Sequence, residues 1–497
     1  MMTSPASPIS AKQIPREVSG VLQGLQDAGF EAFIVGGCVR DLLLGRTPED
    51  WDVTTNARPE EIQKIFLQSF YENRFFTVTV QTGSEEEKLK EIEVTTYRAD
   101  VNYRDRRRPE EVKYAETLEE DLSRRDFTMN AIALAQTSDG KEKIVDPFEG
   151  QKDLEKRLVC AVGMPAERFQ EDALRMMRAA RFATALDFEI EPATKLAIQE
   201  HAGLLGEISG ERIRDELAKM IMAERAVEGI ELLRELKLLR YIMPELEEGC
   251  GVGQNKHHKY DVWEHNLYSL KYAVQQQWSL QVRLASLLHD AGKPRVKQGE
   301  GQNCTFYNHE VVGANMARDI LNRLKFPKKD AEKITRLIRY HMFYYNVDEV
   351  TESSVRRLIR NLGPEHIGDL LKVRMADRIG SGVPKAVPYK LRHWQYLIEK
   401  VSQDPISASM LKINGEDVMK VGQLQPSPTV GQVLSALLGE VLDDPKKNAK
   451  EYLESRAKEL VVLSAEELEK LAAKGREEKE EVEQEREKET KEKYWVK

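Results

Sequence analysis

The stretch GGCVRDLLLGRTPEDWDVTT, residues 36–55, decides the fold of the N-terminal part of the chain. The segment AFIV, residues 32–35, comes directly before it and predicts a short buried strand. Gly36 and Gly37 then allow the backbone to turn tightly and to approach a ligand closely. Arg40 follows within the same turn, where its guanidinium group can reach a phosphate. The segment therefore predicts a strand that ends in a phosphate-binding turn.

Two carboxylates, Asp50 and Asp52, flank Trp51 in the same stretch. On a strand, residues two apart point to the same face, so these carboxylates would repel each other unless a cation lay between them. Mg²⁺ uses few carboxylates and takes its other ligands from water and substrate phosphates, which favours metal-assisted phosphoryl or nucleotidyl transfer. A lone Asp-x-Asp is more often a surface turn with two solvated acids. Here, however, the complete string GG-x-VRD-x-LLG-x-x-x-x-D-x-D is present.

This string resembles the motif of class II nucleotidyltransferases, the family of tRNA CCA-adding enzymes and bacterial poly(A) polymerases. The resemblance implies an α/β nucleotidyltransferase head, with a small mixed sheet and helices, in which Asp50 and Asp52 are catalytic and hold Mg²⁺. It also implies that Gly37 and Arg40 bind the nucleotide. Glu93, in the strand-like run KEIEVTTY, is either a third acid near the metal or an exposed strand residue.

A second motif, RRDFTMNAIAL at residues 124–134, holds Arg125, Asp126 and Asn130. Asp126 could cap a helix, the ordinary role of an aspartate before a helical segment, or it could accept a hydrogen bond from a ribose hydroxyl. The motif resembles the string RRDFT-x-NA of the same family. The resemblance implies that all three residues hold the incoming nucleotide.

A third motif is EDALRMMRAARF, residues 171–182. On a helix, Asp172 and Arg175 would be neighbours. The ordinary structural interpretation of such a pair is a surface salt bridge. Cytosine N4 and adenine N6 are amino donors that a carboxylate accepts, whereas guanine and uracil carry a carbonyl oxygen that it repels. The motif resembles the family's E-D-x-x-R template, which implies that Asp172 and Arg175 select C and A. Arg178 and Arg181 would then face the triphosphate or the RNA backbone.

The second half of the chain carries an independent set of histidines and acids. Neutral imidazole together with carboxylate suits a divalent transition metal. The segment resembles the HD phosphohydrolase domain, whose H…HD…D pattern is matched by His265, His289, Asp290 and Asp377. Further histidines that would allow a second metal are His309 and His341. The resemblance implies phosphatase or 2′,3′-cyclic phosphodiesterase activity, and the alternative is a degenerate, purely structural domain.

Length and composition fit a cytoplasmic enzyme of several domains. A chain of 497 residues should hold roughly three or four domains. No apolar stretch is long enough to span a membrane, and the first residues lack the apolar core of a secretory signal. The four cysteines lie far apart, with neither a metal-binding spacing nor a disulfide framework, which suits a reducing compartment.

The net charge of −9 argues weakly against non-specific binding to nucleic acid. Local basic surface matters more for phosphate contacts than the total charge does. Residues 97–114, YRADVNYRDRRRPEEVKY, predict a basic loop that contains Arg98, Arg104, Arg106, Arg107 and Arg108. Such a loop either contacts RNA or is simply solvated.

Changes in pattern divide the chain into an α/β part and an all-α remainder. Strand-like runs mix with helical stretches up to about residue 160, and from about residue 166 almost every segment has a helical pattern. We predict five regions. An N-terminal extension (residues 1–26) precedes a nucleotidyltransferase head (27–160) and a helical neck and body that bind RNA and the nucleotide base (161–250). An HD domain (251–400) and a helical tail (401–497) follow. The highly charged end of the tail predicts a solvated helix or a disordered segment.

The predicted function is addition of CCA to the 3′ end of tRNA from CTP and ATP, without a nucleic-acid template and with additional HD phosphohydrolase activity. A poly(A) polymerase and an enzyme that adds only CC or only A share the head motifs, although CC-only enzymes look truncated at the basic loop. From a different class, the chain could be an HD phosphohydrolase whose head only binds RNA, or a purely structural RNA-binding protein. Intact Asp50 and Asp52 argue against both. The sequence does not specify the oligomeric state.

Overall fold

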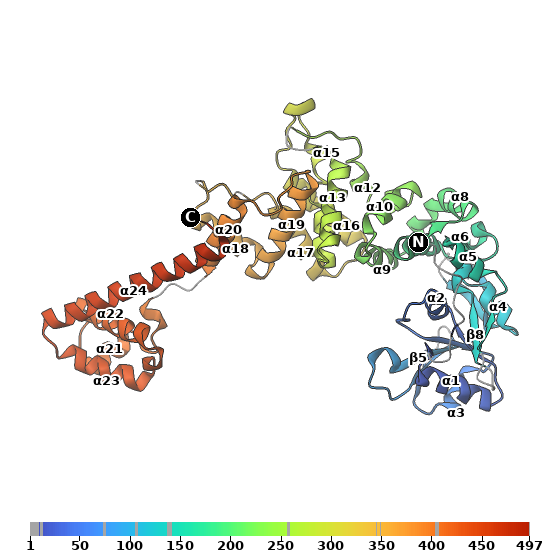
Figure 1. The fold of residues 1–497 in the computed structure, drawn as a ribbon, viewed down its shortest axis with the longest axis horizontal. Helices are drawn as coiled ribbons and strands as arrows, with labels where there is room; N and C mark the ends of the chain where they lie inside the picture. Colours follow the sequence, from blue (N-terminus) through green and yellow to red (C-terminus); the bar gives the residue numbers. More distant parts are fainter. Residues whose placement is uncertain are drawn as a thin grey trace. The chain divides into compact units, whose positions relative to one another are not determined.

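The structure of the protein is a computed structural model that describes most of the chain (Figure 1). The described residues exclude 1–8, 10–12, 73–75, 105–107, 137–141, 256–258, 344, 348, 403–406 and 497, and the backbone alone is described for residues 72, 99–104 and 108–112. Arg106 and Arg107 of the predicted basic loop therefore lie outside the described residues. The chain divides into two compact units: unit 1 is Met1–His341 with Gly368–Pro384, and unit 2 is Met342–Ile367 with Lys385–Lys497.

A seven-stranded mixed sheet is the centre of the N-terminal part of unit 1. Its strands, in spatial order, are β3 (Ser69–Glu72), β4 (Thr77–Gln81), β5 (Glu91–Thr96), β2 (Asp52–Thr55), β1 (Ala32–Val35), β8 (Ala133–Gln136) and β9 (Glu142–Val145). Strands β2 and β5 run parallel, and the other neighbouring pairs are antiparallel. Helix α1 (Arg16–Asp27) packs on β1 and buries Val18, Leu22 and Leu25, which are spaced one helical turn apart. This mixed sheet with helices confirms the predicted fold class.

The predicted basic loop is wrong in its secondary structure. Its backbone forms an antiparallel hairpin of β6 (Arg98–Arg104) and β7 (Arg108–Tyr114), which is separate from the main sheet. Such a ribbon need not show the alternation of apolar and polar residues by which a strand is usually predicted. Two further strands, β10 (Leu158–Val159) and β11 (Glu189–Ile190), pair in parallel and are too short to leave a pattern in the sequence.

The rest of unit 1 is helical, as predicted. Its helices are α2 (Gly37–Leu43), α3 (Pro59–Ile65), α4 (Leu118–Ser123), α5 (Gly150–Lys156), α6 (Pro165–Glu171), α7 (Leu174–Leu186), α8 (Pro192–His201), α9 (Gly210–Met222), α10 (Ala226–Glu235), α11 (Leu239–Ile242), α12 (Pro244–Glu247), α13 (Val262–Gln275), α14 (Leu280–Leu288), α15 (Lys293–Val296), α16 (His309–Arg323), α17 (Lys328–Tyr340) and α19 (Ile367–Gly380). Helix α14 packs against α9, α13 and α17, and every residue from 282 to 288 is buried. A helix buried on all sides delivers the residues that follow it into the interior.

Unit 2 is entirely helical in its described part. Its helices are α18 (Glu352–Leu362), α20 (Tyr389–Ser402), α21 (Gly415–Gly422), α22 (Pro428–Asp443), α23 (Lys450–Val461) and α24 (Ala465–Tyr494). The charged end of the chain is therefore a helix, the red ribbon of α24 in Figure 1, and it buries Leu468, Ala472 and Gly475. In the described part of the chain, no helix is both long and apolar enough to cross a membrane.

Helices α22 and α24 pack closely at two glycines. A Cβ atom on Gly475 would lie 2.2 Å from the carbonyl oxygen of Ser435, and one on Gly439 would lie 2.7 Å from the Cα of Gly475. The two backbones are therefore in direct contact at this point. This contact sets the distance between the helices that form much of the unit 2 core.

We predict that Gly475→Ala destabilises unit 2 by about 1–3 kcal/mol, because the added methyl group must push the α22 backbone away. Gly431→Ala is the matched control on α22, since a Cβ atom there meets nothing within 4 Å. An exposed helical alanine should be neutral or should stabilise by up to about 1 kcal/mol. Urea denaturation monitored by circular dichroism measures both variants. Equal stability of the two proteins would show that the crossing is not tightly packed.

Candidate functional site

The turn after β1 brings the backbone against two charged side chains. Gly36 adopts a φ of +86°, which other residues rarely tolerate. A Cβ atom at this position would lie 2.9 Å from Nη1 of Arg125 and 3.6 Å from Oδ2 of Asp52. The glycine is therefore needed both for its conformation and for the space that it leaves. Helix α2 begins at Gly37, directly after the turn.

Asp50 and Asp52 lie next to each other, but only one belongs to a strand. Asp52 is the first residue of β2, whereas Asp50 lies in the bend before it, so the prediction that both lie on the strand is wrong at Asp50. Buried Trp51 separates them, and Asp50 is exposed whereas Asp52 is half-buried. Burial raises the pKa of the Asp52 carboxyl, Arg125 opposes this effect, and the nearby charge of Asp50 adds to it. A cation between the two carboxylates would relieve this repulsion.

The sheet register places a third acid beside this pair. Asp52 pairs with Glu93 on the parallel neighbour β5, and paired residues of adjacent strands point to the same face. The three carboxylates offer the oxygen ligands that Mg²⁺ prefers. The chemistry of these side chains therefore suits a magnesium ion.

Four of the predicted nucleotide-binding residues form one chain of polar contacts from α2 to α7. Arg40 Nη1 donates to Asn130 Oδ1 at 2.9 Å, and Asn130 Nδ2 donates to Asp126 Oδ1 at 3.2 Å. Arg178 Nε donates to the other oxygen of Asp126 at 2.7 Å. Burial opposes ionisation of Asp126, but Arg178 and Asn130 lower its pKa to about 2. Asp126 therefore anchors polar side chains and does not cap a helix.

An aromatic ring and a buried acid hold the arginines of this region. The guanidinium carbons of Arg40, Arg178 and Arg181 lie 5.1, 5.3 and 3.9 Å from the centre of the Phe182 ring, within the range of cation–π attraction. Glu216 of α9 accepts a hydrogen bond from Arg181 Nε and lies 3.9 Å from Arg178 Nη1. Neither Phe182 nor Glu216 was among the residues predicted for the site. The spacing of Arg178 and Phe182, four residues apart on a helix, was the one local signal for the ring.

The EDALR segment does not form the continuous helix that was predicted. Helix α6 ends at Glu171, Asp172 is extended with φ −142° and ψ 101°, and α7 begins at Leu174. The carboxylate of Asp172 accepts a hydrogen bond from the backbone N–H of Leu174 at 3.1 Å. An aspartate competes in this way with helical hydrogen bonds and favours the start of a new helix. The carboxylate is thereby presented from a loop.

Asp172 and Arg175 consequently have different partners. Arg175 is buried, donates to Glu171 Oε2 at 2.7 Å and donates to the Arg124 carbonyl oxygen at 2.8 Å. The carboxylate of Asp172 instead accepts hydrogen bonds from both terminal nitrogens of Arg212, at 3.1 and 2.7 Å. The role of Arg212 was not predictable from local pattern, because its partner lies 40 residues away along the chain.

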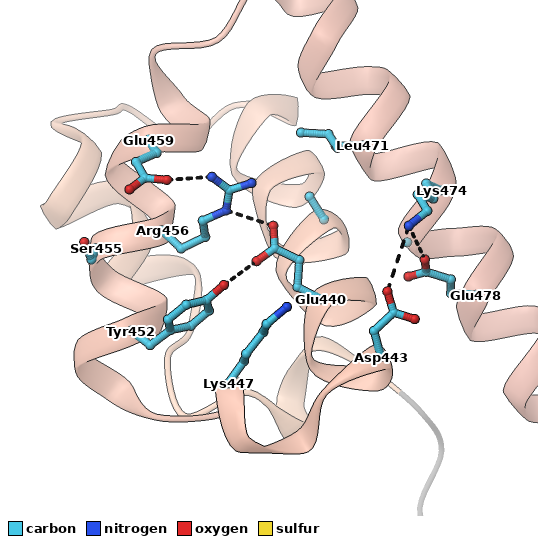
Figure 2. A pocket seen from close by; sticks show the side chains of 12 residues that line it. Glu440, Asp443, Lys447, Tyr452, Ser455, Arg456, Glu459, Leu471, Lys474 and Glu478 are labelled. Carbon is cyan, nitrogen blue, oxygen red and sulfur yellow. Dashed lines mark hydrogen bonds and ion pairs between the residues drawn. The ribbon is translucent and has the colours of Figure 1, made fainter.

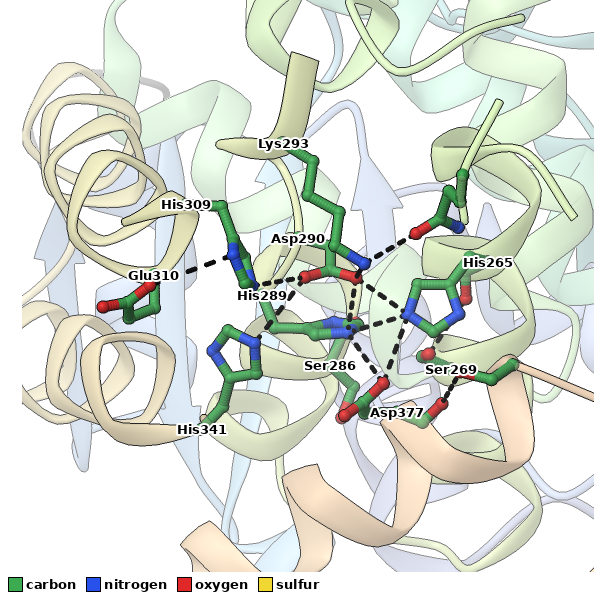
Figure 3. A network of polar contacts seen from close by, with 12 residues as sticks. His265, Ser269, Ser286, His289, Asp290, Lys293, His309, Glu310, His341 and Asp377 are labelled. Carbon is green, nitrogen blue, oxygen red and sulfur yellow. Dashed lines mark hydrogen bonds and ion pairs between the residues drawn. The ribbon is translucent and has the colours of Figure 1, made fainter. Parts of the chain in front are cut away.

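The predicted HD residues converge in unit 1, as Figure 3 shows. They come from α13, the end of α14, the start of α16, the end of α17 and α19. Two groups of possible ligands, each with its ligand atoms within 4.8 Å of one another, share one carboxylate: His265, His289, Asp290 and Asp377, and Asp290, His309 and His341. This arrangement brings together all six residues predicted from the sequence.

Backbone contacts orient the imidazoles toward this shared centre. In His289, His309 and His341, Nδ1 lies 2.9, 2.7 and 2.7 Å from the backbone carbonyl three residues earlier. A carbonyl only accepts, so Nδ1 carries the proton and Nε2 is left to bind a metal. Nε2 of His309 is buried 3.2 Å from Asp290 Oδ1, yet it makes no hydrogen bond among the described residues. Atoms that share a metal ion adopt this kind of arrangement.

The charges of the cluster also favour a cation. Burial opposes ionisation of Asp290 and Asp377, but Lys293 and Arg374 respectively outweigh it and hold both pKa values well below the ordinary value. Burial lowers the pKa of His341 to about 4, which keeps that imidazole neutral. Burial opposes protonation of His289, but Asp290 and Asp377 outweigh it and raise the pKa of this imidazole to about 10, so the anionic centre attracts positive charge. Anionic carboxylates together with imidazole donors suit a divalent transition metal.

A cavity of about 450 Å³ lies between α22, α23 and α24 in unit 2 (Figure 2). Its charged side chains pair with one another. Arg456 and Tyr452 donate to the two oxygens of Glu440 at 2.8 and 2.9 Å, and Lys474 lies 2.9 Å from Glu478. These mutual pairs account for most of its charged lining, so we assign no site to it.

Three protein-family models match the chain. The "Poly A polymerase head domain" matches residues 32–160. The "Probable RNA and SrmB- binding site of polymerase A" matches residues 187–250, and the "HD domain" matches residues 262–378. These ranges contain the sheet with Asp50 and Asp52, the helix that carries Arg212 and the histidine cluster.

Curated relatives are similar along most of the chain. A CCA-adding enzyme of Pediococcus pentosaceus is 33% identical over 438 residues, which cover 87% of this chain and 94% of that protein. A CCA-adding enzyme of Geobacillus kaustophilus is 44% identical over 229 residues, which cover 45% of this chain and 53% of that protein.

Solved structures share the fold. The Bacillus stearothermophilus CCA-adding enzyme in complex with CTP aligns with a TM-score of 0.58 and 29% identity, over 90% of this chain and 98% of that chain. The Thermotoga maritima CCA-adding enzyme complexed with tRNA aligns with a TM-score of 0.54 and 18% identity, over 92% of this chain and 100% of that chain. The second likeness bears on the fold alone.

Proposed function

The chain belongs to the family of CCA-adding enzymes, and we propose that it adds CCA to the 3′ end of tRNA from CTP and ATP, with Asp50 and Asp52 as its catalytic residues. The observation that carries this assignment is the group of carboxylates beside the Gly36 turn, with Arg125 held against the same backbone. The motifs shared with poly(A) polymerases lie in the head. The 33% identity to a CCA-adding enzyme extends over 438 residues and so favours CCA addition.

The head residues divide the work of binding and activation. Asp50 and Asp52 would hold Mg²⁺, which when bound supplies Lewis-acid activation of the RNA 3′-hydroxyl and neutralises phosphate charge. Arg125 and Arg40 point toward this turn and would hold the triphosphate as charge-assisted donors. Asp126 and Asn130 orient the arginines and offer hydrogen-bonding groups to the ribose. Gly37 begins α2 without a side chain that could obstruct the phosphates.

Base choice is assigned to the loop between α6 and α7. Asp172 would accept the amino group of cytosine or adenine and would repel the carbonyl oxygen that guanine or uracil carries in its place. Arg212 already donates to both oxygens of Asp172 and so keeps the carboxylate oriented. Arg175, tied to Glu171, would supply the donor to the ring acceptor after it turns outward. Arg178 and Arg181 would contact the phosphates or the RNA backbone.

The histidine cluster is assigned a separate hydrolytic function. We propose that His265, His289, Asp290 and Asp377 bind a divalent transition metal, and that a second ion can bind where His309 and His341 face Asp290. A bound metal of this kind supplies an activated water for attack on a phosphate ester or a 2′,3′-cyclic phosphate. The orientation of the imidazoles by backbone carbonyls supports this assignment.

We predict that Asp50→Ala or Asp52→Ala lowers nucleotide addition at least about 1,000-fold, because a bound metal contributes several kcal/mol to the transition state. The assay uses tRNA transcripts that end before CCA, after C and after CC, each with one labelled nucleotide. Binding of tRNA, measured by filter retention, should persist. Asp27→Ala, an exposed residue of α1, is the control. Addition by the Asp50 and Asp52 double variant at the wild-type rate would remove the head assignment.

We predict that Asp172→Ala raises incorporation of U or G about 10- to 100-fold relative to C and A. This factor corresponds to the free energy of one hydrogen bond to a charged group. Removal of the carboxylate abolishes repulsion of a carbonyl oxygen and frees Arg212 to donate to it. Single-nucleotide competition on the same transcripts measures the ratio. Asp215→Ala on α9, whose carboxylate is largely exposed beside Arg214, is the control. Unchanged selectivity with lower thermal stability would make Asp172 a structural residue.

We predict that His289→Ala loses the bound transition metal and the hydrolysis of 2′,3′-cyclic nucleotides and phosphate esters, while CCA addition stays nearly unchanged. The ligands lie on helices that share no residue with the head motifs. Metal content by mass spectrometry, after exchange into chelated buffer, and hydrolysis rates are the measurements. His201→Ala on α8 is the control. A wild-type protein that holds no metal and hydrolyses neither substrate would show that the cluster is only structural.

A further inference from the structure

Asp121, near the end of α4, is a fully buried acid to which the proposed reaction assigns no role. Its side chain is 0% exposed, and its Oδ1 accepts hydrogen bonds from Nε and Nη2 of Arg124 at 3.0 and 2.9 Å. The backbone N–H of Arg98 donates to the same oxygen at 3.4 Å. The other oxygen lies 3.3 Å from the hydroxyl of Thr54 and 3.7 Å from Nη2 of Arg125. A buried charge with this many partners is held in one position.

These contacts connect Asp121 to the catalytic edge of the sheet. Thr54 lies on β2, two residues after Asp52. Arg125 passes from Asp121 to the Gly36 turn, where its Nη1 lies 2.9 Å from the position of a Cβ atom on Gly36. The Nε of Arg125 is buried and has no hydrogen-bond partner in the described part of the chain. The guanidinium group of Arg125 thus has one terminal nitrogen near the carboxylate of Asp121 and the other against the Gly36 turn.

The turn at Ser123 and Arg124, at the end of α4, contacts α6 and α7, the helices on either side of the base-selecting loop. The carbonyl oxygen of Arg124 accepts a hydrogen bond from Arg175 at 2.8 Å, and the carbonyl oxygen of Ser123 accepts one from Arg168 at 3.3 Å. Because Asp121 binds the side chain of Arg124, it fixes the backbone that receives Arg175. The carboxylate of Asp121 therefore supports Arg125 directly and supports Arg175 through Arg124.

We propose that Asp121 is a positioning residue that aligns Arg125 with the catalytic carboxylates and couples this alignment to the Arg175 loop. This inference rests on the proposed nucleotidyl transfer. Removal of the negative charge would leave Arg125 with Asp52, on the other side of the Gly36 turn, as an acidic neighbour. The guanidinium group would then be drawn toward the metal-binding carboxylates and away from the triphosphate. The Arg124 turn would lose the anchor that keeps its carbonyl oxygen directed at Arg175.

Asp121→Asn removes the charge with almost no change in shape. We expect kcat for CTP and ATP addition to fall on the order of 100-fold, because a small displacement of Arg125 weakens its contact with the transition state. The change in KM should be smaller. Incorporation of U and G relative to C and A should rise in the same variant. Rates are normalised to active sites by a single-turnover burst, so that a loss of folded protein alone leaves kcat unchanged. Glu119→Gln, the same charge change on the exposed side of α4, is the control.

A double-mutant cycle tests whether Asp121 acts through Arg125. The Asp121→Asn, Arg125→Ala protein should add nucleotides no more slowly than Arg125→Ala alone, because the residue that Asp121 positions is already absent. Additive losses would overturn the proposal. If Asp121→Asn does not fold, Arg124→Gln removes the paired donors that hold Asp121 and should reproduce both effects in weaker form.

The controls separate this inference from the function on which it rests. A wild-type protein that adds no CCA would overturn the proposed function itself. A wild-type protein that adds CCA, together with an Asp121→Asn variant of equal kcat and equal base selectivity, would overturn only the role of Asp121.

Discussion

The narrow space at Gly36, where the backbone turn meets the guanidinium group of Arg125 and the carboxylate of Asp52, is the constraint on which the head depends. A side chain there would have to displace one of the two charged groups. The sheet order places β1 and β2 side by side, so the turn after one strand and the acid at the start of the other must share this space. The proposed phosphate site and the proposed metal site are therefore parts of one packed structure.

Paired charges extend from this point into the helical neck. Glu216 and Arg212 lie one helical turn apart on α9, and they bind Arg181 and Asp172 respectively. A chain with a net charge of −9 can thus present arginines to a nucleotide because each one is held by an acid or an aromatic ring. Buried pairs of this kind add little net stability but impose a defined geometry on each arginine. The basic character that nucleotide binding requires is local.

The two candidate metal sites differ in the same physical terms. The head offers carboxylate oxygens at the start of β2, which suits a hard cation that keeps water and phosphate ligands. The histidine cluster is buried at the end of α14, and its imidazoles are oriented by backbone carbonyls. Nitrogen donors in such a setting favour a softer transition metal. The donor chemistry of the two candidate sites therefore suits a different ion at each one.

The short motifs were predictable because each one is local. Apolar patterns in the sequence predict the elements on which, or beside which, these motifs lie: the Gly36 turn, Asp52 and the His289–Asp290 pair. Arg212, Glu216 and Asp121 were not predictable, because their roles depend on partners far along the chain. Asp121 sits in the string EEDLSRRD, which has the pattern of a solvated helix. Two of its hydrogen-bond partners, Arg98 and Thr54, lie 23 and 67 residues away along the chain. Long-range packing thus decides which charged residues support the site, whereas local pattern decides which ones form it.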